Sequence, residues 1–414
     1  MLTQLEYGAL QSKIRHLHIK LDLLNEQDYI VDRLEGIATG GSINLSADSV
    51  YRRTGNLTMV LKPQYNLLPS PSAKLWFDKR TAISIGIESY LSSEIVWFNL
   101  GRFAISNINV TRDISSLLVN CELLDYMAFL DGTLGGLLPG AIKIEQDSMT
   151  ITQAIRNITA FLPKTVIEPI MAINTEDLVP ETIEMGIGTS TYDLLKNLID
   201  RYANYEIFFD INGYLRVQRV RKRISDPIAW SFAETKLNLN DNSTMEFKNI
   251  KNSIWVWGRV RETEAIELKI RNRWARNTIA DLDNLLNKEI GDICWVSNTQ
   301  QSFMWDGDNW VVVDLIVEPL FNIEAIGEKI HTVENSDIIT MDQALIRGLL
   351  ELRERSNFAQ QINFNTVPIY ALGPNSKVFI SSPEVGVEGE FLVTQLTLPL
   401  GLESSSITCK KIYY

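Results

Sequence analysis

The stretch GRFAISNINV, residues 101–110, returns near the end of the chain as GEFLVTQLTL, residues 389–398. The two segments align without a gap at an offset of 288 positions. Internal similarity of this kind is tested first, because repeats decide the architecture of a chain. The aligned pairs, which continue beyond both segments, are Gly101 and Gly389, Phe103 and Phe391, Ile105 and Val393, Ile108 and Leu396, Val110 and Leu398, Ser116 and Ser404, Val119 and Ile407, and Cys121 and Cys409.

Length and composition indicate a folded protein of several domains. The chain has 414 residues, which corresponds to about two to four domains. Hydrophobic residues make up 45% and charged residues 22%, as in globular rather than disordered proteins. The most apolar run, WVVVDLIVEPLF (310–321), is too short for a membrane span and is interrupted by Asp314 and Glu318. The N-terminus lacks the apolar segment of a signal peptide.

Cysteine spacing and net charge narrow the possible classes further. Cys121, Cys294 and Cys409 form no CxxC motif and cannot all pair, which favours reduced thiols in a protein assembled in the cytoplasm. The net charge of −12 repels phosphate and argues against a nucleic-acid binder. One basic run, RVQRVRKR (216–223), has the opposite charge, and we interpret it as the solvated face and end of a strand.

The first 130 residues follow the pattern of β-strands. HLHIKLDL (16–23) and ISIGIE (83–88) alternate apolar and polar residues, which is typical of half-buried strands. Together with NLTMVL (56–61) and two strands after Gly101, they predict an antiparallel barrel or sandwich. The glycine-rich stretch DGTLGGLLPG (131–140) then predicts a domain boundary.

The middle of the chain predicts two helices and a hairpin. SMTITQAIRNITAFL (148–162) and STYDLLKNLIDRYA (190–203) have helical periodicity. The apolar face of the second helix consists of Leu194, Leu195, Leu198, Ile199 and Tyr202. In YEIFFDINGYLRVQRV (205–220), the dipeptide Asn212-Gly213 predicts a hairpin with a type I′ turn.

The last third of the chain predicts strands around one long helix. NSIWVWGRV (252–260) has the pattern of a strand, and residues 263–329 are tryptophan-rich with a predicted hairpin. TMDQALIRGLLELRER (340–355) begins with a capping box, Thr340 and Gln343. Its buried stripe is predicted to be Leu345, Leu349 and Leu352. NFNTVPIYAL and SKVFISS then precede Gly389, so both ends of the chain have the order strand, loop, Gly-x-Phe strand.

Metal, phosphate and nucleophile motifs are absent from the sequence. His16 and His18 share one strand face, but the third histidine, His331, is distant, and a metal site needs three or four ligands. DGDN (306–309) lacks the glycine and glutamate of a calcium loop and predicts a turn. GGS (40–42) and the glycines of 131–140 lack the lysine of a phosphate loop, and no GxSxG motif occurs.

The carboxylates and tryptophans are compatible with an activity on sugars, but their pattern does not favour one. Glu181 with Glu184, or Asp306 with Asp308, could serve a glycosidase, but a chain with 51 acidic residues contains such pairs by chance. Trp255 and Trp257 alternate with Val256, which is more typical of a core or an interface than of sugar stacking. We therefore predict that the chain is not an enzyme.

The order of these segments resembles the baseplate hub and tail-tip proteins of tailed phages and phage-like particles. Four parts carry the resemblance in collinear order, while residues 263–310 depart from it and look like an elaborated insertion. The parts are WFNLGRFAISNI with LLDYMAFLDG (123–132), then TYDLLKNLID with NGYLRV, then NSIWVWGRV with NIEAIGEKI (322–330) and ITMDQALIRGLLELRER, and last VPIYALGPNSKVFI with GEFLVTQLTL.

The resemblance implies a mainly β protein with α+β insertions and two tail-tube-like antiparallel β-barrel domains. The implied domains are residues 1–130 as the first barrel, 131–239 as an α+β domain, 240–262 with 331–414 as the second barrel, and 263–330 as an inserted tryptophan-rich domain. The expected repeat core consists of Gly101, Phe103, Ile105, Gly389, Phe391 and Val393. Phe103 and Phe391 should occupy equivalent buried sites, and the two barrels should share one strand order.

The function that the resemblance implies is structural. The resemblance implies a homotrimer in the virion. Its six barrels would form a pseudo-sixfold ring, and this ring would adapt the tail tube to a threefold spike or fibre. The implied partners are a distal tail or tail-tube hexamer, the tape measure protein, and a central spike, fibre or tail lysin. No cofactor, metal or membrane insertion is expected. DNA would pass an acidic lumen without specific binding, with Arg216–Arg223 off the channel.

Two alternatives belong to other classes. One is a tail-associated cell-wall hydrolase, although that activity normally lies in a further domain beyond the hub. The other is a receptor-binding protein that recognises surface glycans through the tryptophan-rich residues 255–310. Turbidity loss with purified cell walls would support the hydrolase, glycan-array binding would support the receptor, and stable association with tube or distal-tail proteins would support the hub.

Overall fold

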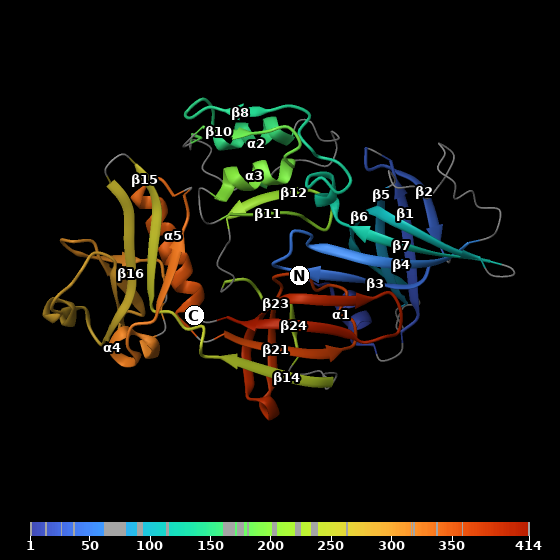
Figure 1. The fold of residues 1–414 in the computed structure, drawn as a ribbon. Coiled ribbons are helices and arrows are strands. Elements are labelled where there is room, and N and C mark those ends of the chain that lie inside the picture. The colour runs from blue at the N-terminus through green and yellow to red at the C-terminus, as the bar shows by residue number, and fades with distance from the viewer. Residues whose placement is uncertain are drawn as a thin grey trace. The chain divides into compact units, whose positions relative to one another are not determined.

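The structure is a computed structural model of the chain, drawn as a ribbon in Figure 1. It describes all residues except 1, 13–14, 26, 36–37, 62–79, 89–93, 113–115, 160–169, 172–177, 180–181, 201–204, 220–224, 233–238, 262–263, 316, 318, 337, 358 and 413–414. The chain forms two compact units. Unit 1 contains Met1–Leu198, Glu206–Asn242 and Ile362–Lys410, and unit 2 contains Ile199–Tyr205, Ser243–Gln361 and Lys411–Tyr414.

A thirteen-stranded sheet in unit 1 contains the same strand arrangement twice. In the first copy, neighbouring strands follow the order β3-β4-β7-β6-β5, and in the second copy the order is β14-β21-β24-β23-β22. The first copy consists of β3 (Ala38–Ser46), β4 (Arg53–Leu61), β5 (Arg80–Glu88), β6 (Ile95–Arg112) and β7 (Leu117–Leu124). The second consists of β14 (Leu239–Glu246), β21 (Ala359–Thr366), β22 (Lys377–Ser382), β23 (Val387–Pro399) and β24 (Ser405–Lys411).

Further elements extend each copy beyond β5 and β22. β1 (Leu17–Leu24) pairs with β5, and β2 (Ile30–Glu35) pairs with β1. In the second copy, the short β13 (Trp230–Ser231) pairs with β22 in parallel. The path of the sheet runs from β14 to β2 without closing among the described strands. Closure of the two copies into barrels therefore stays a prediction.

Residues that alternate along the strands form the core of unit 1. Ile83, Ile85 and Ile87 of β5 have no exposed surface, which agrees with the period-two pattern of this segment. One hydrophobic cluster includes buried side chains from β1 and β3–β7 in the first copy and from β21–β24 in the second. The helix α1 (Gln4–Gln11) packs against β5 and β6 and begins with a capping box formed by Thr3 and Glu6.

The segment between the copies contains the predicted helices, α2 (Ile151–Thr159) and α3 (Thr191–Asp200). α3 buries Leu194, Leu195, Leu198 and Ile199, whereas Tyr202 and the predicted helix ends 160–162 and 201–203 lie outside the described residues. Two small sheets accompany the helices. They consist of β8 (Ile142–Ile144) with β10 (Ile183–Met185), and of β11 (Tyr205–Phe209), β12 (Leu215–Arg219) and β9 (Ile170–Met171).

The hairpin between β11 and β12 forms as predicted, but its turn is not of type I′. Only Gly213 has a positive φ, +77°, whereas type I′ requires it at both central residues. The Asp210 side chain accepts hydrogen bonds from the backbone N–H groups of Asn212 and Tyr214, each at 2.9 Å. These bonds hold a longer loop that starts with an aspartate-capped turn and ends at glycine.

Unit 2 is a six-stranded sheet with one long helix. Its strand order is β19-β18-β17-β16-β15-β20, and the helix packs on β15 and β16. The helix, α5 (Met341–Arg355), begins with the predicted capping box of Thr340 and Gln343. The strands are β15 (Ser253–Arg261), β16 (Glu264–Arg276), β17 (Asp292–Val296), β18 (Gln301–Trp305), β19 (Trp310–Val313) and β20 (Ile330–Glu334).

The structure divides the chain differently from the predicted domains. β15 was expected in the second barrel, but it pairs with β16 and β20 in the sheet of unit 2, and α5 belongs there as well. Alternation shows that one face of a strand is buried and does not specify its partner. Unit 2 is thus inserted between β14 and β21, where the first copy has only the short β3–β4 connection. Residues 263–330 are part of this insertion and not a domain of their own.

Candidate assembly site

The glycines that open the repeated segments share a backbone conformation that other residues avoid. Gly101 has φ +138° and Gly389 has φ +127°. In the strand ladders, Gly101 lies opposite Ile83, and Gly389 lies opposite Ile380. A Cβ atom on Gly101 would also lie only 2.9 Å from Cδ of Arg53. Only glycine fits this conformation without strain.

The phenylalanines two positions later occupy equivalent places in the two copies. Phe103 and Phe391 both have 0% exposed surface. Phe103 lies opposite Thr81 and Phe391 lies opposite Val378, in each case two residues before the isoleucine that faces the glycine. The remaining predicted core residues, Ile105 and Val393, are also buried. The two copies therefore share their local register as well as their strand order.

A direct ladder between β23 and β3 joins the two copies. The strands are antiparallel, with Thr397 opposite Asn44 and Leu398 opposite Ile43. The Thr397 hydroxyl is 2.9 Å from Oδ1 of Asn44. Leu398 is 1% exposed and Ile43 is 0% exposed. This ladder shows how one copy binds the next through strand pairing.

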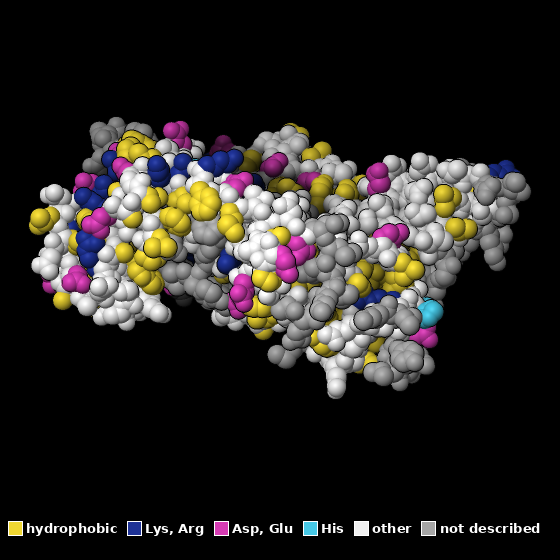
Figure 2. Space-filling model, turned by 90° about the horizontal axis from the view of Figure 1, so that it is seen from below, with side chains coloured by type: hydrophobic (Ala, Val, Ile, Leu, Met, Phe, Trp, Pro, Cys, Tyr) yellow, Lys and Arg dark blue, Asp and Glu magenta, His cyan; other side chains and the backbone are white. Residues whose placement is uncertain are grey.

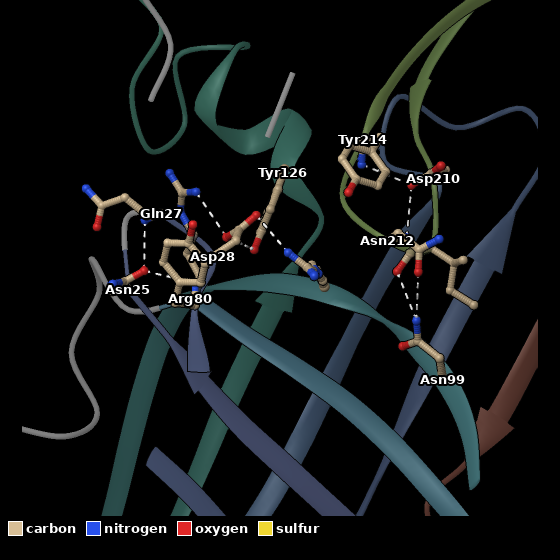
Figure 3. A network of polar contacts seen from close by, with 12 residues as sticks. Asn25, Gln27, Asp28, Arg80, Asn99, Tyr126, Asp210, Asn212 and Tyr214 are labelled. Atoms are coloured by element: carbon tan, nitrogen blue, oxygen red, sulfur yellow. Dashed lines mark hydrogen bonds and ion pairs between the residues drawn. The ribbon is translucent and has the colours of Figure 1, made fainter. Parts of the chain in front are cut away.

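A polar cluster at one end of the first copy surrounds Asp28 (Figure 3). Its Oδ1 accepts a hydrogen bond from the Tyr126 hydroxyl at 2.9 Å and faces Nη1 of Arg80 at 3.2 Å. Its Oδ2 faces Nη1 of Arg102 at 2.9 Å. The side chains of Arg80 and Asp28 are only 4% and 7% exposed. Burial of this carboxylate is tolerated because two cations and a hydroxyl surround it.

The β11–β12 hairpin is attached to the first copy by polar contacts. Nδ2 of Asn99 is 3.2 Å from Oδ1 of Asn212 at the tip of the hairpin (Figure 3). At its base, Arg52 forms a buried ion pair with Glu206 at 2.7 Å. Arg53 donates from Nη1 to the Phe209 carbonyl at 3.1 Å. Sequence patterns did not predict these contacts, because each joins residues more than 100 positions apart.

Asp125 is a buried carboxyl that links β4 to the turn after β7. It is 2% exposed and accepts hydrogen bonds from the backbone N–H groups of Arg53 and Met127. Burial outweighs these bonds and raises the pKa of Asp125 to about 6.

The raised pKa of Asp125 predicts a pH dependence of stability. Because the unfolded carboxyl loses its proton near pH 4, the unfolded state binds fewer protons than the folded state between about pH 4 and 6. Stability should therefore fall by roughly 3 kcal/mol as pH rises through this window, and stay level above it. The measurement is urea unfolding across pH for the parent and for Asp125→Asn. The free energy of unfolding of Asp125→Asn should lack this fall between about pH 4 and 6. If the parent and the variant differed by the same free energy at every pH in this window, the prediction would be refuted.

Two of the three histidines lie near a single carboxylate of their own unit. Within the described residues, no group of three or more His, Cys, Asp or Glu side chains is placed to hold a metal ion. His18 lies 3.8 Å from Glu88, while His331 lies 3.7 Å from Glu351 in unit 2. Glu181 lies outside the described residues.

The acidic turn at residues 306–309 connects β18 and β19, as predicted. Oδ1 of Asp306 accepts the backbone N–H groups of Asp308 and Asn309 at 2.9 and 2.7 Å. These hydrogen bonds hold the pKa of Asp306 below its usual range. The carboxylate is thus used to close the turn.

A polar cavity of about 240 Å³ lies between β4 and the β11–β12 hairpin. Arg52, Arg53, Asp210 and Arg216 contribute to its wall. Arg216 pairs with Asp210 at 2.8 Å from Nε, and Arg52 pairs with Glu206. Among the described residues that line the cavity, none is a serine, cysteine or histidine.

The three cysteines are free and buried. Burial raises the pKa of Cys121 and of Cys294 to about 12, and raises the pKa of Cys409 as well. Such thiols are protonated and unreactive at neutral pH. No helix in the described part of the chain is both long and apolar enough to cross a membrane.

Solved structures of tail proteins share this arrangement, whereas no protein-family model and no curated protein sequence matches the chain. The 43 kDa tail protein of prophage MuSo2 from Shewanella oneidensis aligns with a TM-score of 0.55 at 13% identity, covering 95% of this chain and 98% of that chain. The tail protein from Neisseria meningitidis MC58 aligns with a TM-score of 0.54 at 10% identity, covering 95% and 96%. This chain has the fold of phage tail proteins.

A third tail protein agrees with this assignment of the fold. The prophage tail protein gp18 from Listeria monocytogenes EGD-e aligns with a TM-score of 0.51 at 11% identity, covering 95% of this chain and 94% of that chain. All three alignments extend over nearly the whole chain, including the unit inserted between β14 and β21. The resemblance predicted from the sequence is thus confirmed at the level of the fold.

Proposed function

We propose that the chain is a structural hub protein of a phage tail or baseplate and is part of the virion. The observation that carries the proposal is the duplication, in which two copies with the same strand order and the same local register lie in one chain that has a tail-protein fold. Three such chains present six similar positions in a ring. A ring of this kind has pseudo-sixfold symmetry on one side and can keep threefold symmetry on the other.

The symmetry of the ring defines its partners. The six similar positions fit a hexamer of tail-tube or distal tail protein with the tape measure protein inside, and the threefold side fits a central spike, fibre or tail lysin. Closed rings are the usual outcome of head-to-tail contacts between identical chains, because contacts that do not close produce filaments. The hub thus joins a sixfold tube to a threefold tip.

A ring of this kind would let DNA pass without binding it. The net charge of −12 repels phosphate. On the face seen in Figure 2, Asp and Glu side chains are spread along the view, whereas Lys and Arg side chains gather mainly at its left. We expect an acidic lumen with the basic run off the channel. Arg216 of that run is paired with Asp210, and residues 220–223 lie outside the described residues.

The proposal includes the absence of catalysis by this chain. Among the described residues, the buried carboxylates are each held by arginines or backbone N–H groups of the fold; they are Asp22, Asp125, Asp292 and Glu351. In unit 2, Trp310 packs edge to face against Trp274 and Trp305, at centroid distances of 6.2 and 5.6 Å. Rings that pack against one another offer less surface for stacking on a sugar.

Native mass spectrometry of the full chain, alone and mixed with purified tube or distal tail protein, tests the proposed function. The expected result is a trimer that binds one hexamer, and particle images with threefold symmetry at the position of this chain. A chain that stays monomeric in the assembled tail would refute the hub. Turbidity loss with purified cell walls, abolished by one Asp or Glu substitution, would indicate a hydrolase, and binding to a glycan array would indicate a receptor-binding protein.

A further inference from the structure

We propose that the far half of β6, residues 107–112, pairs edge to edge with β14 of a second copy of this chain. This inference rests on the proposed hub function and identifies the two strands that join one chain to the next. It follows from a comparison of β6 with β23, its equivalent in the second copy. The internal joint between the copies serves as the template for the joint between chains.

The two halves of the template strand β23 pair with different strands. Residues 387–392 pair with β22, and residues 395–399 pair with β3 of the other copy. β23 therefore crosses from its own copy to the next one. Its equivalent, β6, starts in the same way, because residues 95–104 pair with β5. Residues 104–112 of β6 pair with β7 on one side, and no described strand pairs with their other side.

Burial differs between the two strands where the pairing differs. Leu398 of β23 is 1% exposed, whereas its equivalent Val110 in β6 is 41% exposed. Pro399 is buried, and its equivalent Thr111 is exposed. Upstream, where both strands have their partners, the equivalents Phe391 and Phe103 are equally buried. The apolar side chain of Val110 is thus exposed at the place where β3 covers its counterpart.

The strand that fits this edge is β14. In the second copy it has the place that β3 has in the first, next to β21 as β3 is next to β4. β3 has neighbours on both sides, β4 and β23, whereas β14 pairs with β21 alone among the described strands and ends the sheet that they form. An open edge presents unpaired N–H and C=O groups, which favour pairing with another strand.

These two edges are complementary and lie on different strands of one chain. β6 of one chain can pair with β14 of the next, in the antiparallel sense that β23 and β3 show. Such a contact is heterologous, so it repeats from chain to chain until the ring closes. In a trimer, three internal β23–β3 joints would then alternate with three β6–β14 joints between chains, and all six copies would have similar surroundings.

Disulfide scanning of the full chain tests the pairing. Asn109 is the equivalent of Thr397, which lies opposite Asn44 in the internal joint. Asn109→Cys is combined in turn with a cysteine at each position of residues 242–245 in β14. Directly opposite residues of antiparallel strands lie within disulfide reach. The three native cysteines are buried and do not compete.

The expected result is a covalent trimer under mild oxidation, formed by cysteines at alternate positions of β14. A period of two is the signature of strand pairing, because successive side chains point to opposite faces. The matched control is Asn44→Cys with Thr397→Cys. It should form a disulfide inside one chain, so that the covalent mass stays that of a single chain. Oxidation of the control shows that the conditions suffice.

The outcomes separate this inference from the proposed function. Trimers in native mass spectrometry without any cross-link between Asn109 and β14 would overturn the pairing and leave the hub intact. Monomers in which only the control disulfide forms would overturn both. A cross-link between Asn109 and β14 within a single chain would also overturn the pairing.

A second variant tests the same edge without cysteines. Val110→Asp places a charge on the proposed joint and should reduce the trimer fraction at least tenfold, while the circular dichroism spectrum of the chain stays unchanged. Val110→Thr, which keeps the branched shape, should assemble almost as the parent does. Assembly of Val110→Asp at the level of the parent would contradict the proposed pairing.

Discussion

Replacing Phe391 with alanine is expected to destabilise unit 1 by about 3–5 kcal/mol, the usual cost of truncating a fully buried phenylalanine. The side chain has 0% exposed surface and belongs to the hydrophobic cluster that contains both copies. Phe103→Ala should cost a similar amount, because Phe103 has the same burial and the same place relative to the glycine two positions earlier.

Hydrogen exchange of peptides from β6 and β23 measures both effects, since the protection of core amides reports the free energy of opening that part of the molecule. The control is Tyr29→Ala, which removes an aromatic ring that is 70% exposed and should change exchange by no more than about 0.5 kcal/mol. If Phe103→Ala left protection unchanged while Phe391→Ala abolished it, the two sites would not be equivalent.

The repeat could be predicted from the sequence because it rests on local requirements. A glycine at positive φ, followed two positions later by a phenylalanine that fills the core, needs the same residue types in both copies. Alternation within β5 and helical periodicity within α3 are equally local. Such features leave a pattern in a single stretch of sequence.

No such local pattern in the sequence identifies the strand with which each strand pairs. β15 has the alternation of a sheet strand, yet nothing in NSIWVWGRV says whether its sheet contains β16 or β21. The second copy is also interrupted, because unit 2 lies between β14 and β21, whereas β3 and β4 are separated by a few residues. The predicted second barrel, residues 240–262 with 331–414, already allowed for an insertion, but it included β15 and α5, which belong to unit 2.

The candidate assembly site could not be predicted from the sequence for the same reason. Its decisive contrast, Leu398 buried and Val110 exposed, joins positions that look alike in the sequence. The offset of 288 positions identifies them as equivalents, but only the ladder between β23 and β3 reveals that one has a partner strand. The polar cluster around Asp28 was missed for a related reason. Its members come from four segments of the first 130 residues, and none belongs to a recognisable motif.

Replacing Asp28 with asparagine is expected to destabilise the first copy by about 3–5 kcal/mol, because breaking a buried ion pair removes the charge that compensates its partner. The Arg80 side chain is 4% exposed, and its guanidinium lies 4.9 Å from the Phe129 ring and 5.2 Å from the Tyr126 ring. Aromatic faces attract a cation, but more weakly than a carboxylate does at this depth. Asparagine keeps the shape of the side chain and one acceptor for the Tyr126 hydroxyl, so the variant isolates the loss of charge.

The measurement is hydrogen exchange of β1, β5 and β6: β1 ends shortly before Asp28, β5 starts at Arg80, and Arg102 lies within β6. Glu184→Gln is the matched control, since it also neutralises one carboxylate of an ion pair, but Glu184 and Lys143 are 67% and 54% exposed. Solvent screens such a pair, and its loss should leave exchange unchanged. Equal, small effects of the two substitutions would mean that water reaches Asp28 and that the cluster does not hold the end of the first copy together. A large effect of Asp28→Asn alone, confined to the first copy, would identify the cluster as the anchor of β5 and β6, and so of the edge strand through which we propose the chains to join.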